Sequence, residues 1–316
     1  MQNTFKLLVA FDGSPFSDAA IEDLATAGLP STGVDARVVS IAEAWELPDL
    51  AGLGPSGSGR IGAERAELLR SHLNDLMDRT GEMASGAAER VRSTFPDWNV
   101  DSEGFTGKPT VELIRIADEW QPDLIVIGSH GRGFIGRAIL GSVSLKVLHE
   151  ARSSVRVVRK RPETDDGAQR ILVALDGSEC SDLVVETVIG RTWPADTQFL
   201  LVTADDDPGS RPEISSLDAV REAHKDSAEA KAWVERVLQE PMRKFEEAGL
   251  SAKQVCRWAS ASSLILDQAE EWKADCIFIG ARGVGRVSRM FLGSVSAAVA
   301  ARAKCTVEVV RDPAVH

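Results

Sequence analysis

Apolar and polar positions along the chain follow two patterns that alternate with each other. Short, almost continuous apolar runs predict buried strands, and in the first half they lie at residues 6–11, 36–42, 99–105, 123–127 and 155–159. Stretches with helical spacing separate them, at about 17–27 with Ser17 as N-cap, at about 63–94, from Pro109 onward and at 142–152. This alternation predicts an α/β fold, a doubly wound parallel sheet of five strands in the order 3-2-1-4-5 with helices on both faces.

The same pattern occurs a second time. The segment Lys6–Ser14 (KLLVAFDGS) recurs as Arg170–Ser178 (RILVALDGS). Strands are predicted near 170–175, 197–203, 251–258, 275–279 and 306–310, and a long helix at about 214–248 should kink or break at Pro241. The duplication predicts two tandem domains, at 1–160 and 170–316, joined by a polar linker at 160–169.

The last strand of each repeat would leave an exposed sheet edge. Because exposed edges tend to be paired or covered, we expect strands 155–159 and 306–310 to pair antiparallel across the domain interface.

A glycine motif follows the fourth strand of each repeat. Gly128-Ser129-His130-Gly131 is followed after nine residues by Gly141-Ser142, and the second copy has Gly280-Ala281-Arg282-Gly283, nine residues and Gly293-Ser294. Glycine permits a tight turn and close approach to a ligand, and the start of the following helix favours an anion. A tight strand-to-helix turn without a ligand is the simpler interpretation of one copy, but two copies with identical spacing favour a phosphate cradle.

An aspartate follows the first strand of each repeat, Asp12 and Asp176. In the predicted sheet the first and fourth strands flank the crevice, so each carboxylate should face a glycine loop. It could accept hydrogen bonds from a ribose hydroxyl or an adenine amino group. Alternatively, Asp-Gly-Ser is simply a turn closed by the aspartate side chain.

Charged and polar residues surround these motifs. Arginines in the two loops could bind phosphates, or they could simply be solvated. Ser142 and Ser294 are expected to be helix N-caps. These arginines are Arg132, Arg137, Arg282, Arg286 and Arg289.

Composition narrows the classes of function. A net charge of −12 argues against a nucleic-acid surface, and the sequence has neither an apolar run of the ~20 residues that span a bilayer nor a signal-peptide pattern. The four cysteines are widely spaced and, like the scattered histidines, form no metal pattern, which indicates reduced thiols in a cytoplasmic protein. The P-loop and Rossmann motifs are absent, and no catalytic triad is readable, so catalysis is not supported.

The sequence Gly-x2-Gly-x9-Gly-Ser after the fourth strand, with Asp-Gly-Ser after the first, resembles the ATP-binding universal stress protein family in a tandem two-domain form. The resemblance covers both halves. It implies a stress-response regulator that holds ATP, or AMP or ADP, in these loops, with Mg²⁺ accompanying the phosphates. In the first half it implies binding by Ala10, Asp12, Ile41, Gly128, His130, Gly131, Arg132, Gly133, Gly141, Ser142, Val143 and Ser144. In the second half it implies binding by Ala174, Asp176, Val202, Gly280, Arg282, Gly283, Gly285, Gly293, Ser294, Val295 and Ser296.

Several alternatives stay open. A slow ATPase and a nucleotide-free scaffold or dimerisation module are the other functions, while an adenylating enzyme is disfavoured because Phe11-Asp12-Gly13-Ser14-Pro15 departs from its loop. A further homodimer and the downstream partner are undecided. The two sites should also differ, since Gly107-Lys108-Pro109 of the first repeat is matched by Ala259-Ser260-Ala261. A turn that depends on glycine would then be lost in the second site, which makes the first site the safer assignment.

Overall fold

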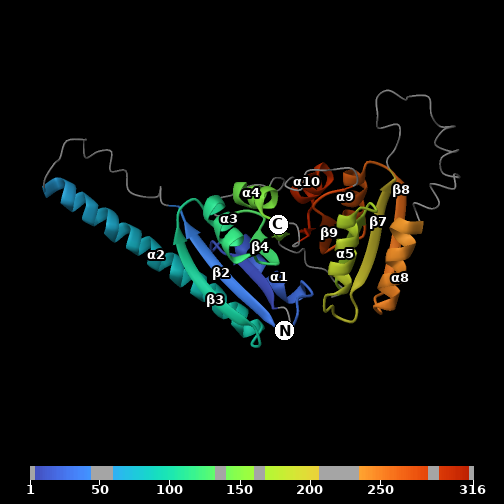
Figure 1. The fold of residues 1–316 in the computed structure, drawn as a ribbon, viewed down its shortest axis with the longest axis horizontal. Coiled ribbons are helices and arrows are strands. Elements are labelled where there is room, and N and C mark those ends of the chain that lie inside the picture. The colour runs from blue at the N-terminus through green and yellow to red at the C-terminus, as the bar shows by residue number, and fades with distance from the viewer. Residues whose placement is uncertain are drawn as a thin grey trace, which may run out of the picture.

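The computed structural model describes residues 4–43, 60–131, 140–159, 168–205, 235–283 and 292–312. These residues form two α/β halves that share one ten-stranded sheet, in the order β3-β2-β1-β4-β5-β10-β9-β6-β7-β8 (Figure 1). Each half therefore has the predicted 3-2-1-4-5 order, and all strand pairs within a half are parallel. The predicted fold class is confirmed.

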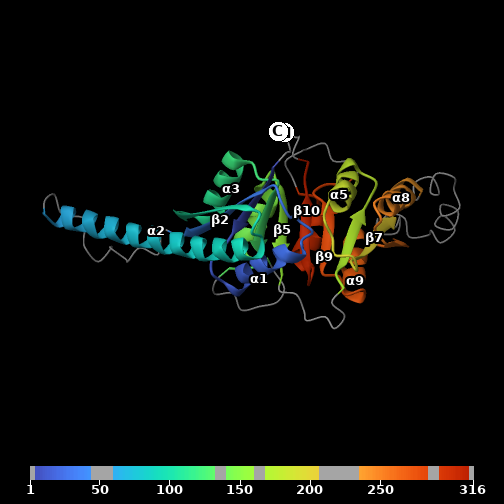
Figure 2. The same cartoon turned by 90° about the horizontal axis from the view of Figure 1, so that it is seen from below.

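The first half alternates strands and helices as the apolar pattern predicts. Its elements are β1 (Phe5–Ala10), α1 (Pro15–Asp23), a short 3₁₀ turn (Leu24–Thr26), β2 (Val34–Ala42), α2 (Arg60–Thr94), β3 (Asn99–Thr106), α3 (Pro109–Trp120), β4 (Leu124–Gly128), α4 (Ser142–Glu150) and β5 (Ser154–Val158). Helix α2 packs along β3 and extends well beyond the sheet (Figures 1 and 2).

The second half repeats this order. Its elements are β6 (Arg170–Leu175), α5 (Glu179–Ile189), β7 (Gln198–Asp205), α8 (Glu240–Glu247), β8 (Ala252–Trp258), α9 (Ala261–Glu271), β9 (Cys276–Gly280), α10 (Ser294–Arg302) and β10 (Thr306–Val310). Of the helix predicted at 214–248, residues 214–234 lie outside the described residues, as do 160–167 of the linker. Near Pro241, where a kink or break is predicted, the helix changes type without an interruption: a π-helical turn (Glu235–Gln239) runs directly into α8, which has the proline in its first turn.

Three helix starts differ from the prediction. The N-cap of α1 is Ser14, whose hydroxyl accepts from the Ser17 backbone N–H at 3.2 Å, because Pro15 suits the first helical position. In α4 and α10 the caps are the glycines of the loops, so Ser142 and Ser294 are the first helical residues rather than N-caps. Because the final loop glycine has extended backbone and acts as the cap, each helix begins one residue earlier than it would with a serine cap.

The two halves meet at the edge predicted from the sequence. Strands β5 and β10 pair antiparallel, with Arg156 opposite Glu308. On one face of the sheet a single apolar core continues across this seam beneath α3, α4, α9 and α10. On the other face two separate cores lie under α1 and α2 and under α5 and α8.

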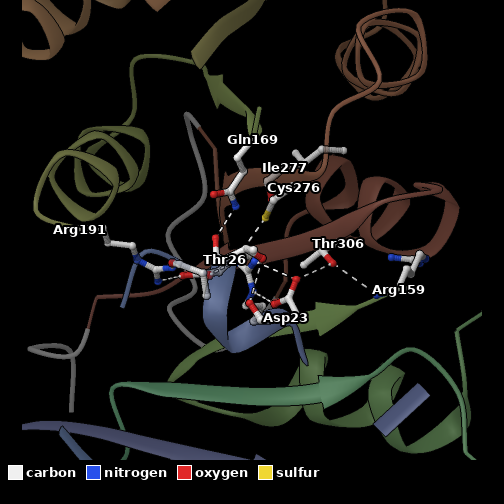
Figure 3. A network of polar contacts seen from close by, with 11 residues as sticks. Asp23, Thr26, Arg159, Gln169, Arg191, Cys276, Ile277 and Thr306 are labelled. Carbon is white, nitrogen blue, oxygen red and sulfur yellow. Dashed lines mark hydrogen bonds and ion pairs between the residues drawn. The ribbon is translucent and has the colours of Figure 1, made fainter. Parts of the chain in front are cut away.

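A buried ionic network lies at the seam on this second face (Figure 3). Arg156 donates to Asp23 at 2.5 Å and to Glu308 at 2.9 Å, and Arg191 donates to the other oxygen of Glu308. Arg156 and Glu308 are 1% and 0% exposed. Burial acts to lower the pKa of Arg156, but Coulomb attraction, from Asp23 first and also from Glu308, raises it well above its ordinary value.

Two further arginines link the halves reciprocally. Arg159, after β5, donates to the backbone carbonyl of Ala300 at the end of α10, and Arg311, after β10, donates to the backbone carbonyl of Leu148 at the end of α4. Each guanidinium thus donates to a backbone carbonyl near the C-terminus of a helix from the other half. Its positive charge also interacts favourably with the helix dipole there. Burial lowers the pKa of both arginines, that of Arg311 to about 10.

Candidate functional site

One pocket opens in each half where the strand order reverses, at the C-terminal ends of β1 and β4 and of β6 and β9. Their volumes are about 480 Å³ in the first half and about 530 Å³ in the second. Doubly wound sheets place ligands at this point, and both volumes are within the range of small-molecule sites.

The predicted site residues gather at these pockets. The first pocket is lined by Ala10, Asp12, Ile41, Gly128, His130, Gly131, Gly141, Ser142, Val143 and Ser144. The second is lined by Ala174, Asp176, Val202, Gly280, Arg282, Gly283, Gly293, Ser294, Val295 and Ser296. The remaining loop residues of the prediction, Arg132, Gly133, Arg137, Gly285, Arg286 and Arg289, lie outside the described residues. A binding role for any of them stays a prediction.

Each aspartate closes a turn and also faces the glycine loop. Oδ1 of Asp12 accepts from the backbone N–H of Ser14 at 3.0 Å, so the aspartate side chain closes the Asp-Gly-Ser turn. The other oxygen lies against the loop, since a Cβ added to Gly131 would come within 2.9 Å of Oδ2.

The second half repeats the arrangement. Oδ1 of Asp176 accepts from the Ser178 N–H at 3.0 Å, and a Cβ on Gly283 would lie 2.4 Å from Oδ2. In both halves one oxygen therefore fixes the carboxylate and the other is directed to the pocket side.

The loop glycines allow close backbone approach. A Cβ on Gly128 would lie 2.7 Å from the Phe16 backbone, and the Gly141 N–H donates to the Ser129 carbonyl at 2.8 Å, which closes the loop on itself. The loop then enters α4, whose first-turn N–H groups have no acceptor within the helix. Residues 142–144, which carry these groups, line the pocket, so this wall suits an anion.

The second serine of each Ser-Val-Ser segment, Ser144 or Ser296, joins the start of the helix to the end of the fourth strand of its half. The Ser144 hydroxyl donates to the Gly128 carbonyl at 2.7 Å, and the Ser296 hydroxyl donates to the Gly280 carbonyl at 2.6 Å. Both serines are buried. They position the start of the helix, which is a structural role next to the one predicted for them.

Strand pairing corrects the match between the second strands of the repeats. Ala10 pairs with Val39 and Ala174 pairs with Val202, so Val202 corresponds to Val39. The counterpart of Ile41 is Ala204, which also lines its pocket. An apolar run alone leaves this register free to slip, and only pairing with the first strand determines it.

Several lining residues were not predicted. Leu113 of α3 and Ile265 of α9 line the two pockets at matching helix positions, and α2 adds Thr80 and Met83 to the first pocket. The helical spacing of Leu113 was a usable signal. Nothing local to α2 indicates that its middle passes the end of the sheet.

The departure before the third helix has a structural counterpart. Gly107 has φ +153°, whereas Ala259 is not among the described non-glycine residues with positive φ, so the backbone differs there. Helix α9 nevertheless begins at Ala261, the position that matches Pro109. The glycine-dependent turn is lost, but the helix start is kept.

No group of three or more His, Cys, Asp or Glu side chains suited to a metal ion occurs in the described part of the chain. Nor is any helix in that part both long and apolar enough to cross a membrane.

Two doubly wound halves, each with a glycine loop and a carboxylate at the reversal of strand order, define a tandem α/β protein with one such pocket in each half. The model of the Universal stress protein family matches residues 4–159 and 167–311, and the chain belongs to this family.

Relatives cover nearly the whole chain. Universal stress protein Rv2005c of Mycobacterium tuberculosis is 26% identical over 319 residues, 97% of each chain, and Rv1996 of the same organism is 25% identical over 325 residues, 99% of this chain and 98% of its own. Among solved structures, a universal stress protein from Archaeoglobus fulgidus has a TM-score of 0.61 at 20% identity, covering 97% of this chain and 98% of its own. This likeness shows the shared fold.

Proposed function

We propose that the protein binds an adenine nucleotide, ATP or its di- or monophosphate, in each of its two pockets, and that the bound nucleotide regulates its shape or its choice of partner. One observation supports this most directly. In both halves a carboxylate held through one oxygen, a glycine loop and a helix N-terminus converge on one pocket. The helix start suits phosphates, and the carboxylate suits a ribose hydroxyl or an amino group.

The pockets fit this ligand class in size and lining. Apolar side chains of the second strand and third helix, such as Val39 and Leu113, offer a surface for a base. At the loops the side-chain-free glycines leave room that a Cβ would fill. Mg²⁺ would enter with the phosphates, and hydrolysis is not part of the proposal.

Two solved structures bear on ligands in the family. One is an Arabidopsis thaliana member with AMP bound, and the other is a universal stress protein in complex with cAMP. They cover 46% and 45% of this chain with TM-scores of 0.34 and 0.33, so the pockets themselves have to support nucleotide binding here.

The test is titration of the full chain with ATP, AMP and GTP by calorimetry, with thermal unfolding in parallel. We expect saturable binding of two adenine nucleotides per chain and a stabilisation of about 2.7 kcal/mol at a hundredfold excess over Kd. Phosphate release measured in the same samples tests the ATPase alternative.

The matched variants are Gly131→Ala with Gly283→Ala, which place a Cβ against the two aspartates, and Gly86→Ala on α2, where a Cβ meets nothing within 4 Å. The double variant should lose binding and keep its fold, while Gly86→Ala should bind normally. Absence of binding in the unaltered chain, or unchanged binding in the double variant, would refute the proposal and favour a nucleotide-free scaffold.

A further inference from the structure

We propose that the second pocket prefers nucleotides with more phosphates and that Arg282 confers this preference, whereas the first pocket, with His130 at the same position, discriminates little between ATP and AMP. This inference rests on the proposed function and assigns different ligands to its two sites.

His130 and Arg282 occupy equivalent positions. Each is the third residue of its glycine motif, directly before the glycine that faces the aspartate, and each lines its pocket. The preceding glycines, Gly128 and Gly280, pack against the same point of the fold, the second residue of α1 and of α5. The two side chains therefore reach their pockets from the same place on the loop.

His130 is held by its own half. Its ring packs against Phe16 with centroids 5.0 Å apart, and its Nδ1 lies 3.1 Å from the Ser129 hydroxyl. These contacts keep the imidazole beside the wall of the pocket.

The second half replaces both of these partners. Cys180 stands where Phe16 does, and Ala281 stands where Ser129 does, so neither the ring nor the hydroxyl is available to the loop. Arg282 makes no side-chain hydrogen bond or ion pair with any described residue. A guanidinium, which is charged at all physiological pH values, is thus left in the pocket with its donors available.

The charge of Arg282 also acts on Arg311, which does not itself line the second pocket. Arg311 lies close enough that burial and, next, the charge of Arg282 lower its pKa to about 10. A bound anion would relieve this repulsion. Each added phosphate charge should therefore contribute more at this pocket than at the first, because Arg–phosphate hydrogen bonds are charge-assisted and often bidentate.

Each pocket can be measured alone. Gly131→Ala is used to block the first pocket and Gly283→Ala the second, with a calorimetric stoichiometry of one confirming each background. Should Gly131→Ala lower the unfolding temperature, Asp12→Asn replaces it. ATP and AMP are then titrated into each background.

We expect the Gly131→Ala protein to bind ATP at least about tenfold more tightly than AMP, and the Gly283→Ala protein to show a ratio below about threefold. Arg282→His should reduce the first ratio to that of the other pocket, Arg282→Lys should retain part of it, and His130→Arg should raise the second. Higher salt should reduce the ratio at the second pocket most.

Equal ratios at the two pockets, or an Arg282→His variant that weakens ATP and AMP alike, would overturn the inference and leave nucleotide binding intact. If the unaltered chain binds neither nucleotide, the proposed function itself fails. The two failures are therefore distinguishable.

Discussion

Glu308→Gln should destabilise the protein strongly, because Glu308 is the carboxylate on which two buried arginines converge. Arg156 reaches one oxygen at 2.9 Å and Arg191 reaches the other, and the glutamate side chain is 0% exposed. Glu308→Gln keeps the shape of the side chain but removes its charge. Asp23 then remains to balance two guanidinium groups at the seam.

The magnitude follows from the burial of the group. Removing one partner of a buried ion pair costs about 3–5 kcal/mol, because the remaining charge is left uncompensated in a poorly solvated place. An exposed pair is different, since solvent screens it and its net contribution is about 0–1 kcal/mol. The pair of Lys304 and Glu270, with a 2.5 Å contact and side chains 76% and 64% exposed, provides that comparison.

The assay is urea unfolding of Glu308→Gln and Glu270→Gln, followed by fluorescence and circular dichroism. We expect the first variant to lose about 3–5 kcal/mol and the second at most about 1 kcal/mol. A double-mutant cycle with Arg156→Met should show strong non-additivity, because the two residues share one network. Equal losses in the two single variants would show that the seam network contributes no more than a surface pair.

Three other outcomes are expected. Gly104→Ala should lower stability by about 1–3 kcal/mol in urea unfolding, because its Cβ would lie 2.4 Å from the Gly81 nitrogen in α2. Ligand binding in the first pocket should weaken as well, since the neighbouring Thr80 of α2 lines that pocket. Unchanged stability would refute this packing. Burial raises the pKa of the Cys305 thiol to about 12, which leaves about one thiolate in ten thousand at pH 8. Alkylation of the native protein followed by mass spectrometry should therefore label the exposed Cys256 before Cys305. Equal labelling of the two thiols would contradict this expectation. Arg311→Met should lower the thermal midpoint, at a cost of about 1–3 kcal/mol, because the Leu148 carbonyl at the end of α4 loses its side-chain donor. Hydrogen exchange at the end of α4 should rise, and unaltered exchange would count against the contact.

Much of the fold could be predicted because its signals are local or repeated. The strands appear as apolar runs, and the predicted strand order alone brings Asp12 and the Gly128 loop to one crevice. The β5–β10 pairing followed from the need to cover two edges. The position of Ser14 rather than Ser17 as N-cap shows how finely a neighbouring proline shifts a boundary.

Other features depend on contacts between distant segments. In the sequence nothing distinguishes Arg156 from other polar residues of a strand. Its partners come from distant segments, Glu308 from the paired strand β10 and Asp23 from α1. The correspondence of Ile41 with Ala204 is determined only by the pairing of β2 with β1 and of β7 with β6. The contribution of Thr80 to the first pocket needed the path of a long helix over the end of the sheet.

The shared seam has a consequence for assembly. Since β5 and β10 complete each other, the strands β3 and β8 are the outer borders of the described sheet. The first border carries exposed Asp101 and Glu103, and the second carries exposed Lys253 and Arg257. Two molecules that met through identical borders would oppose like charges, so these side chains disfavour lateral growth of the sheet into symmetric aggregates, whereas an acidic border facing a basic one would be electrostatically favourable.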